Sequence, residues 1–195
     1  KPLRDASRGT RLQRVLAEAG VASRRTCERL IEEGHVRVND RVVTTLPAWV
    51  DPDEDRIEVD GRRVGTRQRL VYVMLNKPKH TISTSKDEPG SDRRTVTQLV
   101  SHPSGVRLFS VGRLDYDTTG LVLLTNDGKL AGLLTHPRYG IAKTYRATVR
   151  GRLDDDAIDR IERGVFLVER RPGKAVGAAR TGEVEVEVIR RDRDR

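Results

Sequence analysis

The stretch Gly112–Gly120 reads GRLDYDTTG and lies between two apolar segments, each of which predicts a strand. The first segment is Leu108–Val111, whose extended pattern ends at Gly112, and the second is Leu121–Thr125. Asp115 is therefore predicted at a bend between two strands, where a rigid sheet can present a reactive side chain. Acidic residues beside Thr and Gly also form ordinary turns, so this position alone leaves a purely structural role open.

The same stretch partly matches a calcium-binding loop. Asp115, Asp117 and Gly120 stand at the first, third and sixth positions of such a loop. The fifth position is Thr119, and the twelfth is Asn126, where the loop requires a bidentate Glu. The flanking residues also have strand-like rather than helical patterns. Calcium binding is therefore excluded, and no Cys/His cluster predicts another metal site.

The composition describes a charged and strongly basic chain. Of its 195 residues, 35% are hydrophobic and 34% are charged, and the net charge is +9, so a polyanion such as RNA is the expected partner. The single cysteine, Cys27, excludes an internal disulfide and suits a reducing cytoplasm. No segment approaches the ~20 apolar residues of a membrane span. We expect a cytoplasmic monomer without membrane contact.

Residues 11–64 have the pattern of a small unit of two helices followed by strands. Apolar residues at helical spacing predict a helix that ends at Gly20. Ser23 is a suitable N-cap for a second helix, which Gly34 terminates. The predicted strands lie in Val36–Val43, which alternates around an Asn-Asp turn, and in Arg56–Gly61. The polar and basic residues 1–10 are expected to form a disordered lead-in.

Cations concentrate in the first part of this unit. Arg24 and Arg25 follow the predicted cap Ser23, so they would place guanidinium donors beside a helix N-terminus, a good site for a phosphate. The RNA-binding residues predicted for the whole chain are Arg11, Arg14, Ser23, Arg24, Arg25, Arg37, Asn39 and Lys77. For each arginine alone, a solvated surface position is an equally good interpretation.

A polar linker at residues 65–69 is predicted to lead into a second domain, residues 70–195. Leu70–Leu75 is predicted to open this domain as a buried strand, and Asn126–Gly128 is predicted to form a turn with positive φ. A polar loop is expected at residues 86–94. The other predicted elements are helices at Thr95–Val100, Gly128–Leu134 and Asp154–Gly164 and strands at Lys143–Val149 and Val184–Ile189.

Several of these strings resemble a known family. Gly112–Gly120, the apolar strand after it and the Asn-Asp-Gly turn closely resemble the active-site signature of RNA pseudouridine synthases of the RsuA/RluB family. Asn76–Lys79 resembles the family motif Asn-Lys-Pro-x-Gly, with His80 at the glycine position, where a positive φ would be less well tolerated. Residues 11–64 resemble an S4 RNA-binding domain through the strings LQRVLA (12–17), ASRR (22–25), IEEG (31–34) and VRVN (36–39).

The resemblance implies an α+β fold, with an S4 domain followed by a mixed, largely antiparallel sheet domain flanked by helices. It implies isomerisation of a uridine to pseudouridine, a reaction that adds and removes no atoms and needs no cofactor or metal. Asp115 would be the catalytic carboxylate, held in a partly desolvated, positively charged pocket. Arg113 would fill the space of the flipped nucleotide or hold its phosphate, and Tyr145 would stack on the uracil. Spacing alone favours a core tyrosine at position 145.

The resemblance also suggests a substrate. The strings DYDTTG (115–120) and HPRY (136–139) resemble members that modify large-subunit (23S) ribosomal RNA, while a small-subunit target stays open. The rival hypothesis is a non-catalytic RNA-binding or ribosome-assembly protein. The family normally continues with a further strand and a basic motif whose cation pairs with the catalytic Asp. No such segment follows Arg195, so a truncated form or an incomplete site is expected.

Overall fold

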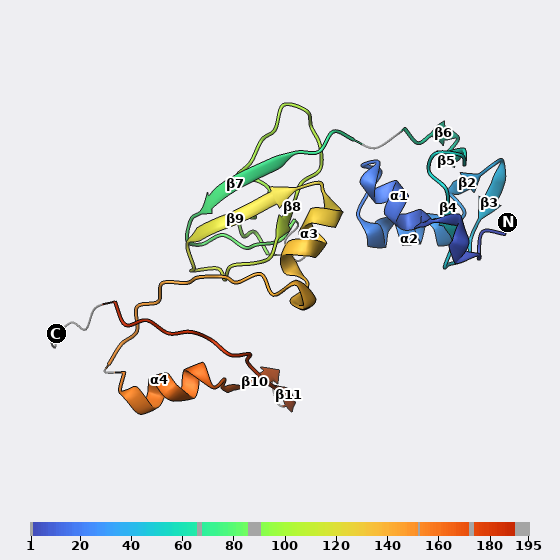
Figure 1. The fold of residues 1–195 in the computed structure, drawn as a ribbon. Coiled ribbons are helices and arrows are strands. Elements are labelled where there is room, and N and C mark those ends of the chain that lie inside the picture. The colour runs from blue at the N-terminus through green and yellow to red at the C-terminus, as the bar shows by residue number, and fades with distance from the viewer. Residues whose placement is uncertain (1, 66–67, 86–90, 152, 172–173, 190–195) are drawn as a thin grey trace. The chain divides into compact units, whose positions relative to one another are not determined.

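The computed structural model describes residues 2–65, 68–85, 91–151, 153–171 and 174–189 (Figure 1). The chain divides into two compact units, residues 1–142 and 143–195. The first contains an N-terminal region (residues 2–64) and a central region (residues 70–142), each with its own core cluster. None of the helices in the described ranges is long and apolar enough to cross a membrane.

The N-terminal region combines two short helices with a four-stranded antiparallel sheet, ordered β3-β2-β5-β6, and a separate β1–β4 pair. Its elements are η1 (Ala6–Arg8), β1 (Thr10–Arg11), α1 (Leu12–Glu18), α2 (Arg24–Glu32), β2 (Val36–Val38), β3 (Arg41–Val43), β4 (Trp49–Val50), β5 (Ile57–Val59) and β6 (Arg62–Arg63). This order confirms the predicted succession of two helices and then strands.

Local signals explain where these elements begin and end. Gly20 follows α1 with a φ of 83°. The Ser23 hydroxyl accepts a hydrogen bond from the Thr26 N–H at 3.1 Å and caps α2 as predicted. Asn39 and Asp40 both have positive φ between β2 and β3, the backbone that a two-residue hairpin turn requires. Cys27 is fully buried in this core, and burial raises the pKa of its thiol.

The predicted disordered lead-in is wrong, because residues 2–10 are part of the N-terminal region. The Arg8 guanidinium donates to both carboxylate oxygens of Asp55, at 2.5 and 2.6 Å, and Leu3 packs against the core cluster. Thr10 pairs with Val50 in the β1–β4 ladder. The polar composition of residues 1–10 does not reveal that they are ordered, because Asp55, the ion-pair partner of Arg8, lies 47 residues further along the chain.

The central region is built on a three-stranded antiparallel sheet in the order β7-β9-β8 (Figure 1). Its elements are β7 (Tyr72–Lys77), β8 (Phe109–Val111), β9 (Gly120–Thr125), α3 (Gly128–Thr135) and η2 (Pro137–Tyr139). One face of the sheet covers a small core of Val71, Val96, Leu108, Val122 and Leu124. The predicted strands before and after the GRLDYDTTG stretch are thus confirmed, and the structure shows that they pair with each other.

Three local predictions for the central region are wrong. The strand that opens it is not buried on both faces, since β7 alternates and Met74 is 78% exposed. Thr95 forms an isolated β-bridge with Ile82, and residues 96–99 form turns instead of a helix that continues through Val100. Asp127 has a φ of −84° and caps α3, so Asn126–Gly128 starts a helix where a positive-φ turn was predicted.

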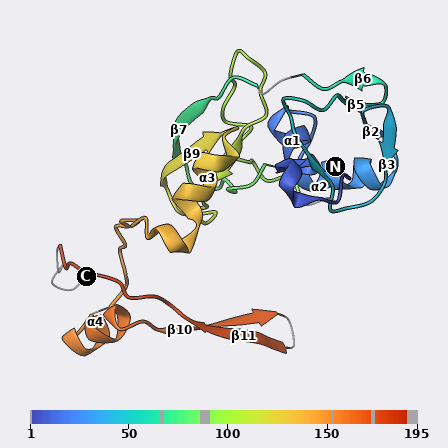
Figure 2. The same cartoon turned by 45° about the vertical axis from the view of Figure 1, so that its right-hand side comes forward.

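The C-terminal unit contains α4 (Asp155–Glu162), β10 (Phe166–Arg171) and β11 (Lys174–Arg180). The predicted helix is confirmed, with Asp154 as its N-cap. The β10–β11 hairpin was missed (Figure 2). The strands predicted at Lys143–Val149 and Val184–Ile189 are wrong, because both segments are irregular. An alternating pattern becomes a strand only where another strand supplies its hydrogen bonds.

Two loop predictions lie partly outside the described residues. These are the predicted linker at 65–69, of which residues 66–67 are not described, and the predicted polar loop at 86–94, of which residues 86–90 are not described.

Candidate functional site

Asp115 lies in the bend that connects β8 to β9. Gly112 leaves β8 with a φ of 75°, a left-handed backbone that favours glycine, and the chain turns again where the Thr118 N–H donates to the Asp115 carbonyl at 3.1 Å. The side chains of Arg113 and Asp115 are both exposed on this bend. The structure therefore brings together two of the three predicted catalytic residues on one short segment.

Ser83 holds the bend from the core side. Its hydroxyl donates to the Leu114 carbonyl at 2.8 Å and accepts from the Leu114 N–H at 3.0 Å. The Ser83 carbonyl in turn accepts from the Ser110 hydroxyl at 3.1 Å, which ties the segment after β7 to β8. Ser83 is 6% exposed, so these bonds are shielded from water. Leu114, the neighbour of Asp115, therefore has both backbone polar groups bound to one buried side chain.

Lys77 supports the other side of Asp115. Its side chain is fully buried, and its ammonium donates to the carbonyls of Thr81 at 2.7 Å, Pro78 at 3.0 Å and Tyr116 at 3.2 Å. Burial lowers the pKa of Lys77, while the negative charges of Asp117 and Asp115 act in the opposite direction. The prediction that Lys77 binds RNA is wrong, because its ammonium is enclosed and bonded to backbone.

The alternation of β7 carries the signal that would have placed Lys77. Val73 and Leu75, which share its face of the strand, both pack against the core cluster of the central region. In a strand, every second side chain points to the same face. When this alternation is continued to Lys77, the last residue of β7, it predicts that the lysine is buried. A buried ammonium needs hydrogen-bond acceptors within the protein. Ser83 offers no comparable signal, because its partner Leu114 lies far along the chain.

His80 occupies the position where the family motif has glycine, and it adopts the left-handed backbone with a φ of 57°. Its Nδ1 lies 3.1 Å from Oδ1 of Asp117, and its ring centroid lies 5.4 Å from that of Tyr116. A non-glycine residue is uncommon in this conformation. His80 therefore has the positive φ that the family's glycine would adopt more easily, and this strained residue lies directly beside the Asp115 bend.

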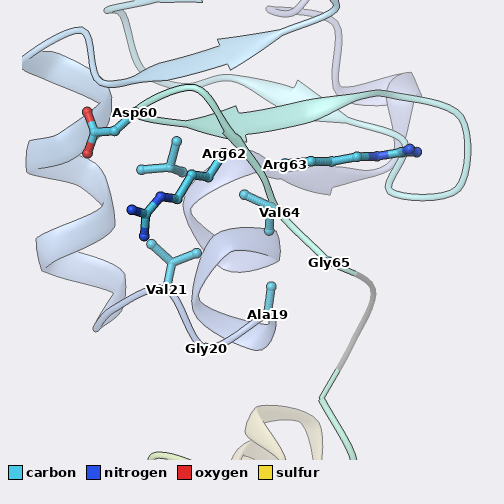
Figure 3. Close-up of a pocket in the computed structure, with 9 residues that line it drawn as sticks. Ala19, Gly20, Val21, Asp60, Arg62, Arg63, Val64 and Gly65 are labelled. Atoms are coloured by element: carbon cyan, nitrogen blue, oxygen red, sulfur yellow. The ribbon is translucent and has the colours of Figure 1, made fainter.

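The enclosure expected around Asp115 is absent from the described residues, where this carboxylate is exposed. Two pockets lie elsewhere. One of about 220 Å³ is lined by Ser85, Thr97, Val100, His102, Val106, Arg107 and Leu108. The other, of about 580 Å³, lies in the N-terminal region and is lined by Ala19, Gly20, Val21, Val59, Asp60, Arg62, Arg63, Val64 and Gly65 (Figure 3). Neither contains a residue predicted for catalysis or RNA binding.

Tyr145, the third predicted catalytic residue, belongs to the C-terminal unit. It is 64% exposed and lies in an irregular segment. Its assignment therefore stays a prediction that rests on the motif. Among the described residues, no three His, Cys, Asp or Glu side chains gather as the ligands of a metal would.

The residues predicted to bind RNA through the N-terminal region fall into two groups. Four arginines are exposed: Arg11, Arg24, Arg25 and Arg37. Arg11 stacks over the Trp49 ring at 5.1 Å from its centroid. The others have partners within the fold: Arg14 pairs with Glu18 at 2.7 Å, Ser23 caps α2, and Asn39 donates to Asp55 and accepts from the Arg56 N–H.

Known proteins match this arrangement over most of the chain. A family model described as RNA pseudouridylate synthase matches residues 71–191, which include the Asp115 bend, and an S4 domain model matches residues 10–46. The chain belongs to the RNA pseudouridine synthase family. It joins an S4 domain to an α+β pseudouridine synthase fold, as the motifs predicted.

Individual members of the family are similar to most of this chain. Ribosomal large subunit pseudouridine synthase B of Bacillus subtilis is 48% identical over 85% of this chain and 66% of its own length. An uncharacterized RNA pseudouridine synthase of Aquifex aeolicus is 45% identical over 80% of this chain and 62% of its own length. A crystal structure of a pseudouridylate synthase matches with a TM-score of 0.51 and 25% identity, covering 93% of this chain and 73% of that one. This chain thus spans under two thirds of the length of these curated relatives.

Proposed function

We propose that this pseudouridine synthase family member isomerises a specific uridine of ribosomal RNA to pseudouridine, and that the target lies in the large-subunit (23S) RNA. The proposed organisation is an S4 domain at residues 11–64 and a catalytic domain from residue 70 onward. The basic charge, +9, suits an RNA substrate. The large-subunit target is supported by the Bacillus subtilis relative, whose name includes that subunit. The proposed setting is ribosome biogenesis in the cytoplasm, by a monomer.

The observation that carries the proposal is the position of Asp115. Its neighbours on both sides, Leu114 and Tyr116, are anchored through their backbones to the buried side chains of Ser83 and Lys77. Its own carboxylate is left exposed. A carboxylate that is free while its backbone is fixed suits a reaction that needs accurate positioning against a bound substrate.

In the proposed reaction, the bond between ribose C1′ and N1 of uracil breaks and C1′ bonds to C5 instead. The proton lost from C5 is balanced by one gained at N1, so atoms and electrons balance without a co-reactant. Asp115 supplies the carboxylate that acts on the extruded nucleoside, at the ribose or the base. Arg113 occupies the space that the nucleotide vacates or holds its phosphate, and Tyr145 stacks on the uracil and assists loss of the C5 proton.

The test is genetic complementation followed by RNA analysis. A strain that lacks the gene is complemented with the wild type or with Asp115→Asn, and pseudouridine in its ribosomal RNA is mapped by mass spectrometry or carbodiimide labelling. We expect one large-subunit pseudouridine to be lost in the deletion strain, to return with the wild type and to stay absent with Asp115→Asn. Asp92→Asn is the matched control, since it removes an exposed carboxylate of the central region away from the Asp115 bend, and it should restore the modification.

The same experiment decides between the enzyme and its rival. Equal restoration by the wild type and by Asp115→Asn would contradict catalysis by Asp115. A strain with defective ribosome assembly but an unchanged pseudouridine map would support a non-catalytic RNA-binding role. If the deletion strain lost a pseudouridine only from small-subunit ribosomal RNA, the proposed reaction would stand, but the proposed large-subunit substrate would be wrong.

A further inference from the structure

We propose that the rings of His80 and Tyr116 form a shelf on which an unpaired nucleobase next to the target uridine stacks. This inference rests on the proposed function and deepens it by naming a second contact of the same site with its RNA. The two residues come from different segments, one after β7 and one from the Asp115 bend, and neither is among the residues that the motifs assign to catalysis or RNA binding.

The first observation is the exposure of both rings in a chain that has few aromatic side chains. Phe, Trp and Tyr make up only 4% of the residues. The His80 side chain is 72% exposed and Tyr116 is 38% exposed. Their centroids are 5.4 Å apart and their planes are tilted by 59°. Because of this tilt, a planar group that stacks on the face of one ring meets the other ring at its edge. Tyr116 directly follows Asp115, so this surface adjoins the catalytic carboxylate.

The second observation is that a contact with the rest of the protein holds each aromatic residue in place. The Tyr116 carbonyl accepts from the buried Lys77 ammonium, so the backbone below its ring is anchored. The His80 ring is oriented by Asp117, whose carboxylate oxygen lies 3.1 Å from Nδ1. A surface that is ordered before binding loses less conformational entropy when a ligand arrives. Tyr72 and Tyr139 are exposed and also held by hydrogen bonds, so the feature that distinguishes the pair is its position beside Asp115.

The third observation is the backbone of His80, which has a φ of 57°. The left-handed region is strained for a residue with a Cβ, and such strain concentrates at functional sites. Glycine would fit this position without strain but would supply no ring. The imidazole therefore has a role that outweighs the backbone cost, and its contacts with Tyr116 and Asp117 place that role on the shelf.

A nucleobase is the ligand whose chemistry fits these rings. Proteins that bind unpaired RNA stack bases on tyrosine and histidine, and each stack contributes similarly for every base because all bases have a π face. The catalytic reaction takes the target uridine out of its own stack, which leaves its neighbour without a partner on one side. An aromatic shelf adjoining Asp115 is placed to replace that partner.

The test uses a short oligouridine RNA that carries one 2-aminopurine, whose fluorescence falls when the base stacks on a ring. The protein is titrated into this RNA, and both affinity and quenching are measured. Tyr116→Ala removes one ring and His80→Gly removes the other while suiting the positive φ. Each should weaken binding about tenfold and abolish most of the quenching.

Two conservative variants separate stacking from structural effects. Tyr116→Phe keeps the ring and should retain both affinity and quenching. His80→Asn tolerates the backbone and keeps a polar group facing Asp117, but it has no ring, so it should behave like His80→Gly. Circular dichroism and the urea midpoint verify folding. Binding and quenching by His80→Asn at the wild-type level, or by Tyr116→Ala at that level, would overturn the shelf.

Failure of the shelf and failure of the proposed function give different results. If Asp115→Asn abolishes the ribosomal pseudouridine while Tyr116→Ala binds and quenches like the wild type, the enzyme stands and the shelf is rejected. If Asp115→Asn leaves the modification intact, the proposed function is rejected. The loss of quenching in the ring variants would in that case still identify a base-stacking surface.

Discussion

The ammonium of Lys77 lies 3.2 Å from the carbonyl oxygen of Tyr116, so the last residue of β7 holds the residue that follows Asp115. The same ammonium also bonds the Thr81 carbonyl at 2.7 Å, which joins the segment after β7 to the bend between β8 and β9. A buried charge satisfied by backbone carbonyls is stable only while those acceptors stay in place. The lysine therefore links the geometry of the candidate site to the stability of the central region.

Replacing this lysine tests that link. Lys77→Met keeps the length and the apolar stem but leaves buried carbonyls without a donor, so we expect a loss of about 2–3 kcal/mol in the free energy of unfolding. Urea denaturation followed by circular dichroism measures it. Lys79→Met is the matched control, because Lys79 is exposed, and it should change stability by less than about 0.5 kcal/mol. Equal stability of the two variants would contradict the supporting role.

Ser83 provides a test of positioning. Ser83→Ala removes the hydroxyl that both donates to and accepts from Leu114, so the Asp115 bend should lose part of its preorganisation. We expect kcat for pseudouridine formation to fall about tenfold with little change in KM, because binding elsewhere on the RNA is retained. Ser101→Ala, at an exposed serine of the same region, is the control. An increase in KM alone would indicate that Ser83 affects RNA binding instead.

The Arg8–Asp55 pair predicts how stability depends on pH. Burial opposes ionisation of Asp55, but hydrogen bonds from Arg8, the Asp51 N–H and Asn39 outweigh it and lower the pKa of this carboxyl. A lowered pKa means that the folded state holds fewer protons than the unfolded state in acid. The stabilisation is therefore present above the unfolded pKa of about 3.9 and is lost as the pH falls through the folded pKa.

Asp55→Asn should remove that pH dependence along with the ion pair. Urea midpoints measured from neutral to acidic pH should fall less steeply for this variant than for the wild type. Asp53→Asn, at an exposed carboxylate of the same loop, should follow the wild-type curve. Parallel curves for the wild type and Asp55→Asn would show that the pair does not contribute as inferred.

The two exposed arginines at the start of α2 predict the salt dependence of RNA binding. Arg24→Ala with Arg25→Ala should weaken affinity and reduce the slope of log K against log salt by about 1.4, the value for two phosphate contacts on a single strand. Arg62→Ala with Arg63→Ala removes the same charge from β6 and is the matched control. An equal change in slope for both pairs would assign the effect to net charge, whereas an unchanged slope for the α2 pair would remove that surface from the proposal.

Signals between near neighbours in the chain were sufficient for many elements. The cap at Ser23, the hairpin turn at Asn39 and Asp40, and the strands on either side of Gly112–Gly120 all lie where the residue types predict them. Caps and turns depend on hydrogen bonds over a few residues, so their physical causes are present in the local sequence. The predicted strands at Lys143–Val149 and Val184–Ile189 failed because a strand also needs a partner, which local alternation does not specify.

The amino-acid sequence by itself was therefore sufficient to predict that Asp115 and Arg113 lie on a bend between two strands. It was also sufficient to identify the family to which the chain belongs. Only the tertiary structure decided what holds that bend, because Ser83 and Lys77 lie 31 and 39 residues before the backbone groups they bind. It also turned Lys77 from a predicted RNA ligand into a buried support and brought the His80 ring against Tyr116. Alternation along β7 indicates that Lys77 is buried. Which distant backbone groups a buried side chain binds depends on how the folded segments pack, and no local pattern encodes those partners.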